Sequence, residues 1–193
     1  MEISSKEEST LAAGAAQSAS LSDRVIQIDG GRVVSFRNAE PQDEPFLLEV
    51  YGSTRLEELA LTNWDAQQRQ AFLKMQFDAQ HDHYGRQYPW AQYLLILVNE
   101  SAVGRLYIAD TEKEIRILDI TVLPEHRGSR VGTAIVRELM GLAAEKGKAL
   151  GIYVEEFNRS LGLFERLGFV RSGESGYSFL MRWSGEATAS QTA

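Results

Sequence analysis

The chain has 193 residues, of which 44% are hydrophobic, and it contains no cysteine. This size and apolar content suit one globular domain, and the missing cysteine excludes disulfides, thiolate metal sites and a cysteine nucleophile. Its 20 basic and 27 acidic residues give a net charge of −7, so we expect no nucleic acid and no anionic membrane as a partner, whereas an amine-bearing substrate suits the acidic surface.

Both ends of the chain predict little packed structure. Residues 1–30 are rich in Ser, Ala, Gly and Glu, which is typical of a flexible arm, although Val25–Ile28 could form a short strand. We expect a single domain over residues 31–184 and a flexible tail over residues 185–193. The start of the chain lacks a secretory signal pattern, and no apolar run could span a bilayer, so we expect a cytoplasmic protein.

The first half of the domain predicts one strand followed by helices. Apolar residues recur at helical spacing after Pro41, and Gly52 breaks this pattern. Ser53 or Thr54 could cap a short helix, and Asp65 a longer one. We therefore expect a strand at 33–37, a helix from Pro41, a short helix ending at Leu61 and a helix that begins after Asp65.

The second half predicts strands mixed with helices. Turn residues at Asn99–Ser101 separate two apolar runs as in a hairpin, while Gly147 and Gly168 are natural helix stops. This order of elements indicates an α/β (α+β) fold. We expect strands at 93–98, 102–108, 114–122 and 150–155, helices at 131–146 and 159–167, and a closing hairpin from Val170 and residues 177–183.

An anion site is predicted where the strand at 114–122 passes through a glycine-containing loop into the next helix. The loop reads His126-Arg127-Gly128-Ser129-Arg130-Val131-Gly132-Thr133. The first N–H groups of a helix have no partner within it, and the helix dipole adds positive potential there. Six amides, those of residues 128–133, could converge on one phosphate.

A second motif lies downstream and reads Asn158-Arg159-Ser160-Leu161-Gly162-Leu163-Phe164-Glu165-Arg166-Leu167-Gly168-Phe169. Together the two motifs resemble those of the GNAT superfamily of N-acetyltransferases. The close match covers residues 114–169. The resemblance implies a GNAT-like mixed, mostly antiparallel twisted sheet of six to seven strands flanked by helices, and acetyl-CoA (coenzyme A) as the cofactor.

The resemblance also implies which residues hold the cofactor. In the family, the loop amides bind the diphosphate, and the strand before the loop bulges so that its backbone pairs with the pantetheine arm. One strand N–H polarises the thioester carbonyl, where charge develops during attack. The implied cofactor-binding residues are Ile120, Thr121, Val122, Arg127, Gly128, Ser129, Arg130, Val131, Gly132, Thr133, Asn158 and Phe164.

Three of these residues carry open alternatives. Arg130 stands where the family has its middle glycine, so it could add a cation for a phosphate or distort the loop. Phe164 stands where many members have a tyrosine that protonates the leaving thiolate, so water, Tyr153 or Tyr177 would take that role. Asn158 could contact the pantetheine arm or cap a helix.

Three carboxylates are candidates for the general base that an amine nucleophile needs. Glu155 is the first choice because alternation puts it with Tyr153 on the strand face opposite Ile152 and Val154, and the resemblance places that strand end at the cleft. Asp119 and Glu114 are reserves. Proximity alone carries much of acyl transfer, so a dedicated base could also be absent.

The acceptor side is implied by the resemblance alone. It places Tyr51, Arg55 and Glu58, together with Tyr88 and Trp90, along the acceptor wall, which suits a small-molecule or peptide amine. The pattern His81-Asp82-His83 lacks a third spaced ligand, so we expect no metal site.

The sequence therefore predicts an acetyl-CoA-dependent N-acetyltransferase that acts on a primary amine by direct attack in a ternary complex. The alternative is a coenzyme A-binding regulatory or interaction domain without catalytic activity, which Arg130 and Phe164 motivate. Transfer of a longer acyl chain is a third reading. The closing strands could mediate a homodimer.

Overall fold

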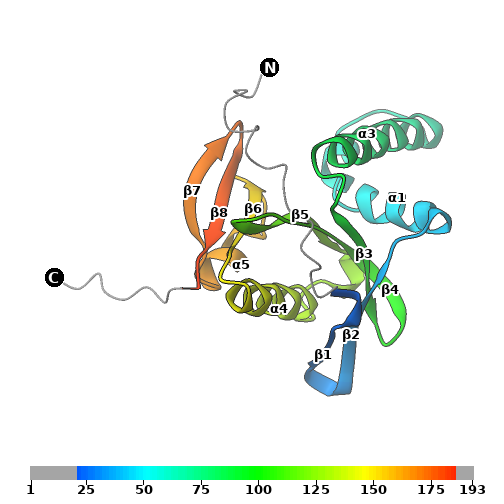
Figure 1. Ribbon diagram of the computed structural model, residues 1–193. Helices are drawn as coiled ribbons and strands as arrows, with labels where there is room; N and C mark the ends of the chain where they lie inside the picture. Colours follow the sequence, from blue (N-terminus) through cyan, green and yellow to red (C-terminus); the bar gives the residue numbers. More distant parts are fainter. Residues whose placement is uncertain (1–20, 186–193) are drawn as a thin grey trace. The chain divides into compact units, whose positions relative to one another are not determined.

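The computed structural model describes residues 21–185, which divide into two compact units. The N-terminal unit holds residues 21–108 and 118–136, and the C-terminal unit holds residues 109–117 and 137–185. Eight strands are present. They are hydrogen-bonded in the order β1-β2-β3-β4-β5 in the N-terminal unit and β5-β6-β8-β7 in the C-terminal unit, with β5 contributing one half to each (Figure 1).

The strands of the N-terminal unit form an antiparallel meander. The hairpin between the third and fourth strands turns through Asn99 and Glu100, both at positive φ, as the predicted turn requires. The order of elements is β1 (Val25–Ile28), β2 (Arg32–Asn38), β3 (Gln92–Val98), β4 (Ser101–Asp110) and the second half of β5 (Glu114–Val122).

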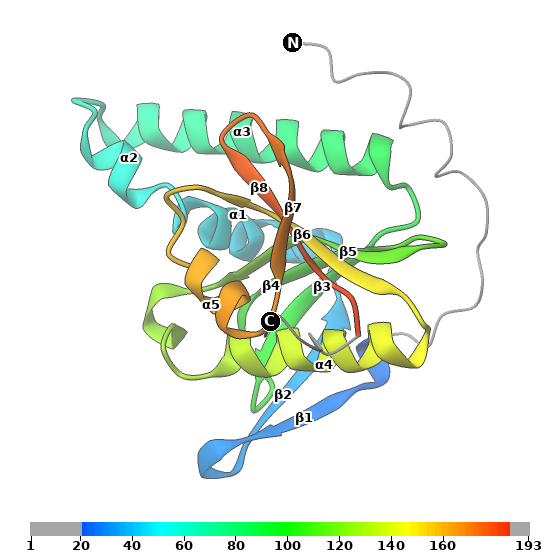
Figure 2. The same cartoon turned by 90° about the vertical axis from the view of Figure 1, so that its left-hand side faces the viewer.

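Three α-helices of this unit lie between β2 and β3 in the chain. Side chains of α1 (Glu44–Gly52) and α3 (Ala66–Gln87) pack on one face of β3 and β4 around Tyr51, Phe77 and Tyr107. Figure 2 shows α3 and α1 running side by side. The third helix is α2 (Leu56–Ala60), and 3-10 turns lie at Leu21–Asp23, Asp29–Gly31, Pro41–Asp43 and Pro124–His126.

In the C-terminal unit, the first half of β5 pairs in parallel with β6 (Ala149–Glu155). The antiparallel hairpin of β7 (Val170–Ser175) and β8 (Ser178–Trp183) follows, with β8 next to β6 (Figure 2). The helix α4 (Val131–Glu145) begins in the N-terminal unit and continues in this one, and α5 (Leu161–Arg166) follows β6.

Several local signals have the predicted effect. Asp65 caps α3 by accepting the N–H of Gln68 at 2.8 Å, and the Gln68 side chain in turn accepts the N–H of Asp65. Gly147 takes a positive φ of 62° after α4, and the N–H of Lys148 bonds back to Ala143 at 2.8 Å. This is the geometry of a glycine helix stop.

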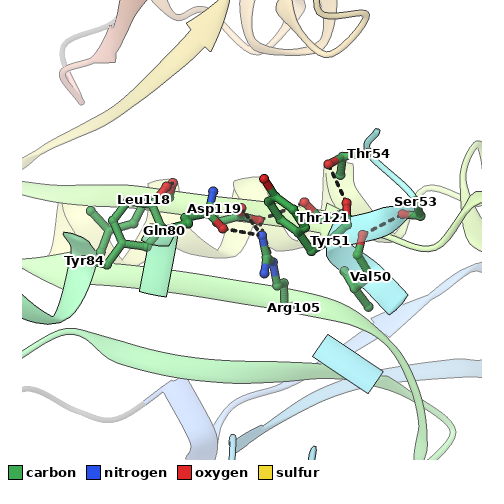
Figure 3. Close-up of polar contacts among 10 residues, drawn as sticks. All are labelled: Val50, Tyr51, Ser53, Thr54, Gln80, Tyr84, Arg105, Leu118, Asp119 and Thr121. Carbon is green, nitrogen blue, oxygen red and sulfur yellow. Dashed lines mark hydrogen bonds and ion pairs between the residues drawn. The ribbon is translucent and has the colours of Figure 1, made fainter. Parts of the chain in front are cut away.

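Three expectations need correction. The strand count is eight rather than six to seven, because Val25–Ile28 pairs with β2 as an additional edge strand. Residues 21–30 of the expected arm are therefore structured, while residues 1–20 and the tail after residue 185 lie outside the described residues. Neither Ser53 nor Thr54 caps α2; their hydroxyls donate to Val50 and Tyr51 carbonyls of α1, each at 2.7 Å (Figure 3).

Candidate functional site

The predicted anion loop lies between the end of β5 and the start of α4. Leu123 still bonds to β4, through its N–H and the Val103 carbonyl at 2.9 Å, and the chain then makes a 3-10 turn. The first bond inside α4 runs from the Ala134 N–H to the Arg130 carbonyl at 3.0 Å. Across residues 21–185, no acceptor takes the amides of residues 128–133. Six donors are therefore available at one helix N-terminus.

Two glycines leave this N-terminus open. Gly128 takes a positive φ of 71°, and a Cβ built on Gly132 would meet no atom within 4 Å. A ligand can thus approach the backbone closely, and the helix dipole favours a negative charge there. The loop fits a diphosphate in charge and in access.

Arg130 adopts the left-handed conformation that the family assigns to glycine. Its φ is +67°. The guanidinium forms an ion pair with Asp29, in the turn between β1 and β2, and both side chains are largely exposed. Whether Arg130 serves as a cation for a phosphate or weakens the loop stays a prediction.

Arg127 links the loop to two neighbouring segments. Its Nε donates to the Val122 carbonyl at 2.9 Å, and its Nη2 donates to the Ser53 hydroxyl at 3.2 Å. The side chain thereby joins the end of β5 to the end of α1. Arg127 thus holds the start of the loop in place.

The second half of β5 approaches β4 unusually closely at Gly104. A Cβ at this position would lie 2.2 Å from the Thr121 carbonyl oxygen and 3.0 Å from the Val122 Cα. No residue other than glycine fits without a backbone shift. The predicted cofactor residues Ile120, Thr121 and Val122 therefore hold a backbone position that depends on Gly104.

A buried ion pair lies beside this part of β5. Arg105 on β4 is 1% exposed, and its Nη2 donates to Asp119 Oδ2 at 2.7 Å and to Gln80 of α3 at 2.9 Å (Figure 3). The Thr121 hydroxyl donates to Asp119 Oδ1 at 2.8 Å. Asp119 is thus an acceptor for a guanidinium and a hydroxyl, which makes it a poor choice for removing a proton from a substrate.

The tyrosines around this ion pair remain protonated. Burial raises the pKa of Tyr84, and the negative charge of Asp119 raises it further. Burial also raises the pKa of Tyr107. Burial lowers the pKa of Arg105, but Asp119 together with Tyr107 and Tyr84 outweighs that effect and raises the pKa above its usual value, so the guanidinium stays charged. Tyr84 donates its hydroxyl to the Leu118 carbonyl of β5 at 2.9 Å, which is a structural role.

In the C-terminal unit, Glu114 is bound by two arginines. Its carboxylate accepts from Arg116 and, at 2.9 Å, from Arg182, and the residue is 8% exposed. Gly151 makes room for this group, because a Cβ there would lie 3.2 Å from Glu114 Oε2. Glu114 is therefore a structural ion-pair partner in this unit.

Glu155 is differently placed, at the end of β6. The predicted alternation holds, since Ile152 and Val154 are buried and Tyr153 and Glu155 are exposed. Glu155 lines an open hollow with Phe157, Tyr177 and Ser178. No cation or hydrogen-bond donor within residues 21–185 binds its carboxylate, so Glu155 is the most accessible of the three candidate bases.

Asn158 precedes α5, and Phe164 lies within this helix. The Asn158 side-chain oxygen accepts the Ser160 N–H at 2.9 Å, which is an Asx turn before the helix and leaves the amide hydrogens as donors; the N-cap of α5 is Ser160. Phe164 is 1% exposed and packs edge to face on Phe169 at 5.2 Å. Phe164 is thus a core residue in this unit rather than an exposed contact.

The family model described as acetyltransferase (GNAT) family matches residues 54–169. The chain belongs to this family. No curated protein sequence matches the chain.

Solved structures agree with this family assignment. PaiA N-acetyltransferase from Thermoplasma acidophilum, in complex with coenzyme A, has a TM-score of 0.59 and 14% identity over 78% of this chain and 98% of its own. An acetyltransferase from Thermus thermophilus has a TM-score of 0.56 and 13% identity over 78% of this chain and 96% of its own. An acetyltransferase from Streptococcus agalactiae has a TM-score of 0.55 and 19% identity over 78% of this chain and 98% of its own. These likenesses support the mixed α/β GNAT fold.

The residues expected on the acceptor wall differ in how accessible they are. Tyr51 is 3% exposed and belongs to the core, where its ring lies 5.5 Å from the guanidinium carbons of both Arg55 and Arg105. Arg55 forms a surface ion pair with Glu58 at 3.5 Å. Tyr88 packs edge to face on Trp90, which is 40% exposed. Trp90 and Glu58 are thus the accessible members.

Several residues around the loop and β5 were missed by the sequence reasoning. Arg105 is the clearest case, and the signal was a charged residue within a strand that is otherwise apolar. Asp29 and Arg32 touch the loop, but nothing in their sequence context indicates this. The carbonyl of Ser129 accepts from Arg32 at 3.0 Å.

Metal and membrane features complete the description of residues 21–185. In that range no group of three or more His, Asp or Glu side chains is placed to hold a metal ion. His81 instead stacks on Phe77 at 6.3 Å. No helix in the same range is long and apolar enough to cross a membrane.

Proposed function

We propose that this protein transfers an acetyl group from acetyl-CoA to a primary amine by direct attack in a ternary complex. The observation that carries the proposal is the set of six unbonded amides, residues 128–133, at the open N-terminus of α4. Family membership supports it, and so does the coenzyme A found in the PaiA structure. Bound there, acetyl-CoA would supply an activated acetyl thioester.

The residues of this chain would have separate tasks. The amides of residues 128–133 would hold the diphosphate, and the backbone of Ile120, Thr121 and Val122, set by Gly104, would receive the pantetheine arm. Neither task needs a side-chain charge, since backbone N–H groups and the helix dipole provide the positive potential.

Glu155 would take a proton from the ammonium group of the acceptor, and the resulting free amine would attack the thioester carbonyl. It is exposed and unpaired within the described residues, whereas Asp119 and Glu114 are bound by arginines. Phe164 has no hydroxyl, so the coenzyme A thiolate would take its proton from water or from Tyr153 or Tyr177, which are both exposed. The acceptor would be a small-molecule or peptide amine, since the accessible residues expected on the acceptor wall, Glu58 and Trp90, are acidic and aromatic.

A binding experiment and a turnover experiment test this function. Calorimetry with coenzyme A should show saturable binding, and a thiol-detection screen over primary amines, polyamines and peptides should show release of coenzyme A that depends on the acceptor. Initial rates at varied concentrations of both substrates should give intersecting lines. Parallel lines would indicate a covalent enzyme intermediate and contradict direct attack.

The second candidate function is a coenzyme A-binding domain without catalysis. The buried Phe164, in place of a tyrosine, favours it. It predicts that acetyl-CoA raises the melting temperature while no amine in the screen releases coenzyme A. Release with any acceptor excludes it.

A further inference from the structure

The feature that prompts the inference is a strained residue in the anion loop. Arg130 is one of three residues other than glycine at positive φ among residues 21–185. The other two, Asn99 and Glu100, form a hairpin turn that favours this conformation. Arg130 lies in no such turn, so its conformation needs support from contacts elsewhere.

The support comes from the turn between β1 and β2, residues Asp29–Arg32, which touches the loop at two adjacent points. The Asp29 carboxylate pairs with the Arg130 guanidinium. Arg32 Nη2 donates to the Ser129 carbonyl at 3.0 Å, and its Nε donates to the Asp29 carbonyl at 3.3 Å. The turn thus holds Ser129 by its backbone and Arg130 by its side chain.

The contact at Ser129 also sets the direction of a ligand donor. All peptide bonds in residues 21–185 are trans, so the Ser129 carbonyl and the Arg130 N–H point in opposite directions from one peptide plane. Arg32 holds the carbonyl on the side of the turn. The Arg130 N–H, one of the six unbonded amides, is therefore held facing away from the turn.

The two arginines at the contact between turn and loop, Arg130 and Arg32, have different kinds of partner. Arg130 is paired with Asp29, and both side chains are largely exposed. Arg32 binds two carbonyls, and no carboxylate in residues 21–185 pairs with it. The turn itself is shaped by Gly30 and Gly31, whose φ values are 78° and 71°. Glycine adopts two such conformations in sequence at little cost.

We propose that Asp29 and Arg32 are positioning residues for coenzyme A. They hold Arg130 in its left-handed conformation, in which its N–H faces the coenzyme. The proposal rests on the proposed function, because it assumes that the loop binds the coenzyme. It goes beyond the family match, which begins at residue 54 and does not include the turn. The β1–β2 hairpin thereby becomes part of the binding machinery.

The test measures coenzyme A affinity by calorimetry on the full chain. Arg32→Gln should weaken binding by about five- to tenfold, where tenfold is 1.4 kcal/mol, and Asp29→Asn, which breaks an exposed ion pair, by about three- to fivefold, since both release the strained residue. Arg69→Gln, which removes an exposed arginine from α3, is the control for lost positive charge and should bind as the unmodified protein does. Tighter binding by Asp29→Asn would mean that Arg130 is a cation withheld from the ligand, and would overturn the proposal.

Glycine at position 130 provides the rescue. Glycine takes positive φ without the Cβ penalty, so Asp29→Asn and Arg32→Gln should each change affinity less than about twofold in the Arg130→Gly background. Equal losses in both backgrounds would show that the turn does not act through the strained residue. Arg32→Lys should stay weakened, because one ammonium cannot replace both contacts; full recovery by lysine would assign Arg32 a role in charge alone.

A ligand lacking the 3′-phosphate separates positioning from direct contact. The loss caused by Arg32→Gln should be the same for coenzyme A and for 3′-dephospho-coenzyme A. A loss that disappears with the second ligand would mean that Arg32 contacts the 3′-phosphate, and would overturn the proposal. If the unmodified protein binds no coenzyme A, the proposed function fails; if it binds and the turn variants bind equally well, only the present inference fails.

Discussion

Arg105 and Asp119 form a salt bridge between β4 and β5 in which the arginine is 1% exposed and the Nη2–Oδ2 distance is 2.7 Å. Three aromatic rings surround the guanidinium, those of Tyr51, Phe77 and Tyr107, at 5.0–5.9 Å from their centroids. The pair therefore fixes the strand that carries the predicted pantetheine contacts.

Breaking this salt bridge should destabilise the protein. Arg105→Met leaves Asp119 without its cation, so the free energy of unfolding should fall by about 3 kcal/mol. The double variant Arg105→Met/Asp119→Asn should recover part of this loss because no unpaired charge remains. Urea unfolding of the two single variants and the double variant measures the coupling. Simple addition of the two single effects would contradict a direct pair.

Gly104 should tolerate no side chain. The Cβ of Gly104→Ala would overlap the Thr121 carbonyl, so β5 must shift, and we expect a loss of about 2 kcal/mol and weaker coenzyme A binding. Gly141→Ala is the matched control, because its Cβ meets nothing within 4 Å and alanine favours a helix. Thermal unfolding and calorimetry compare the two. Equal stability would show that β4 and β5 are not in close contact at Gly104.

A negative charge at the start of α4 should separate binding from folding. Gly132→Asp places a carboxylate in open space at the helix N-terminus, where it stabilises the helix dipole and repels a diphosphate. The melting temperature should be kept or raised, while coenzyme A binds at least about tenfold more weakly. Gly132→Ala controls for size. Unchanged affinity in Gly132→Asp would place the diphosphate elsewhere.

Glu155 should affect turnover and not coenzyme binding. Glu155→Gln removes the proton acceptor, so kcat should fall by about 10²-fold with any amine that the screen identifies, with the KM for acetyl-CoA unchanged. Glu156→Gln is the control, since it removes the neighbouring exposed carboxylate. If the two variants have equal kcat, Glu155 is not the base.

Asp110 should stabilise the protein only above acidic pH. Burial raises the pKa of Asp110, but Lys146 and Lys148 outweigh it, and the folded pKa lies below the usual value. Because the folded pKa is lowered, the stabilisation is complete above about pH 5 and disappears as the pH falls below about 4. Asp110→Asn should therefore lower the free energy of unfolding by about 1–2 kcal/mol at pH 7 and by much less at pH 3. A loss that is equal at both pH values would contradict the ion pair.

Local signals in the sequence predicted most elements of the fold. The strand at 114–122 matches β5, and Asp65 and Gly147 mark helix ends, because each of these effects depends on residues within four positions. Ser53 and Thr54 were misassigned because a hydroxyl between two helices can bond to either one. Here both hydroxyls donate to carbonyls of the preceding helix, α1.

The candidate site was predicted only in its backbone part. The loop amides follow from a strand–loop–helix order that the sequence shows directly. The partners of Arg130, Asp119 and Glu114 do not, because they depend on which strands lie side by side. Asp29 and Arg130 are 101 positions apart, so no local pattern relates them.

The helix α3 spans 22 residues, and Phe77 is its one buried side chain. Most of its backbone hydrogen bonds are thus close to water, and few apolar contacts oppose a transient local opening. Amide hydrogens of α3 should accordingly exchange with deuterium before those of β3 and β4. An opening that includes Gln80 and Tyr84 would break their hydrogen bonds to Arg105 and to the Leu118 carbonyl and would let water reach the central guanidinium.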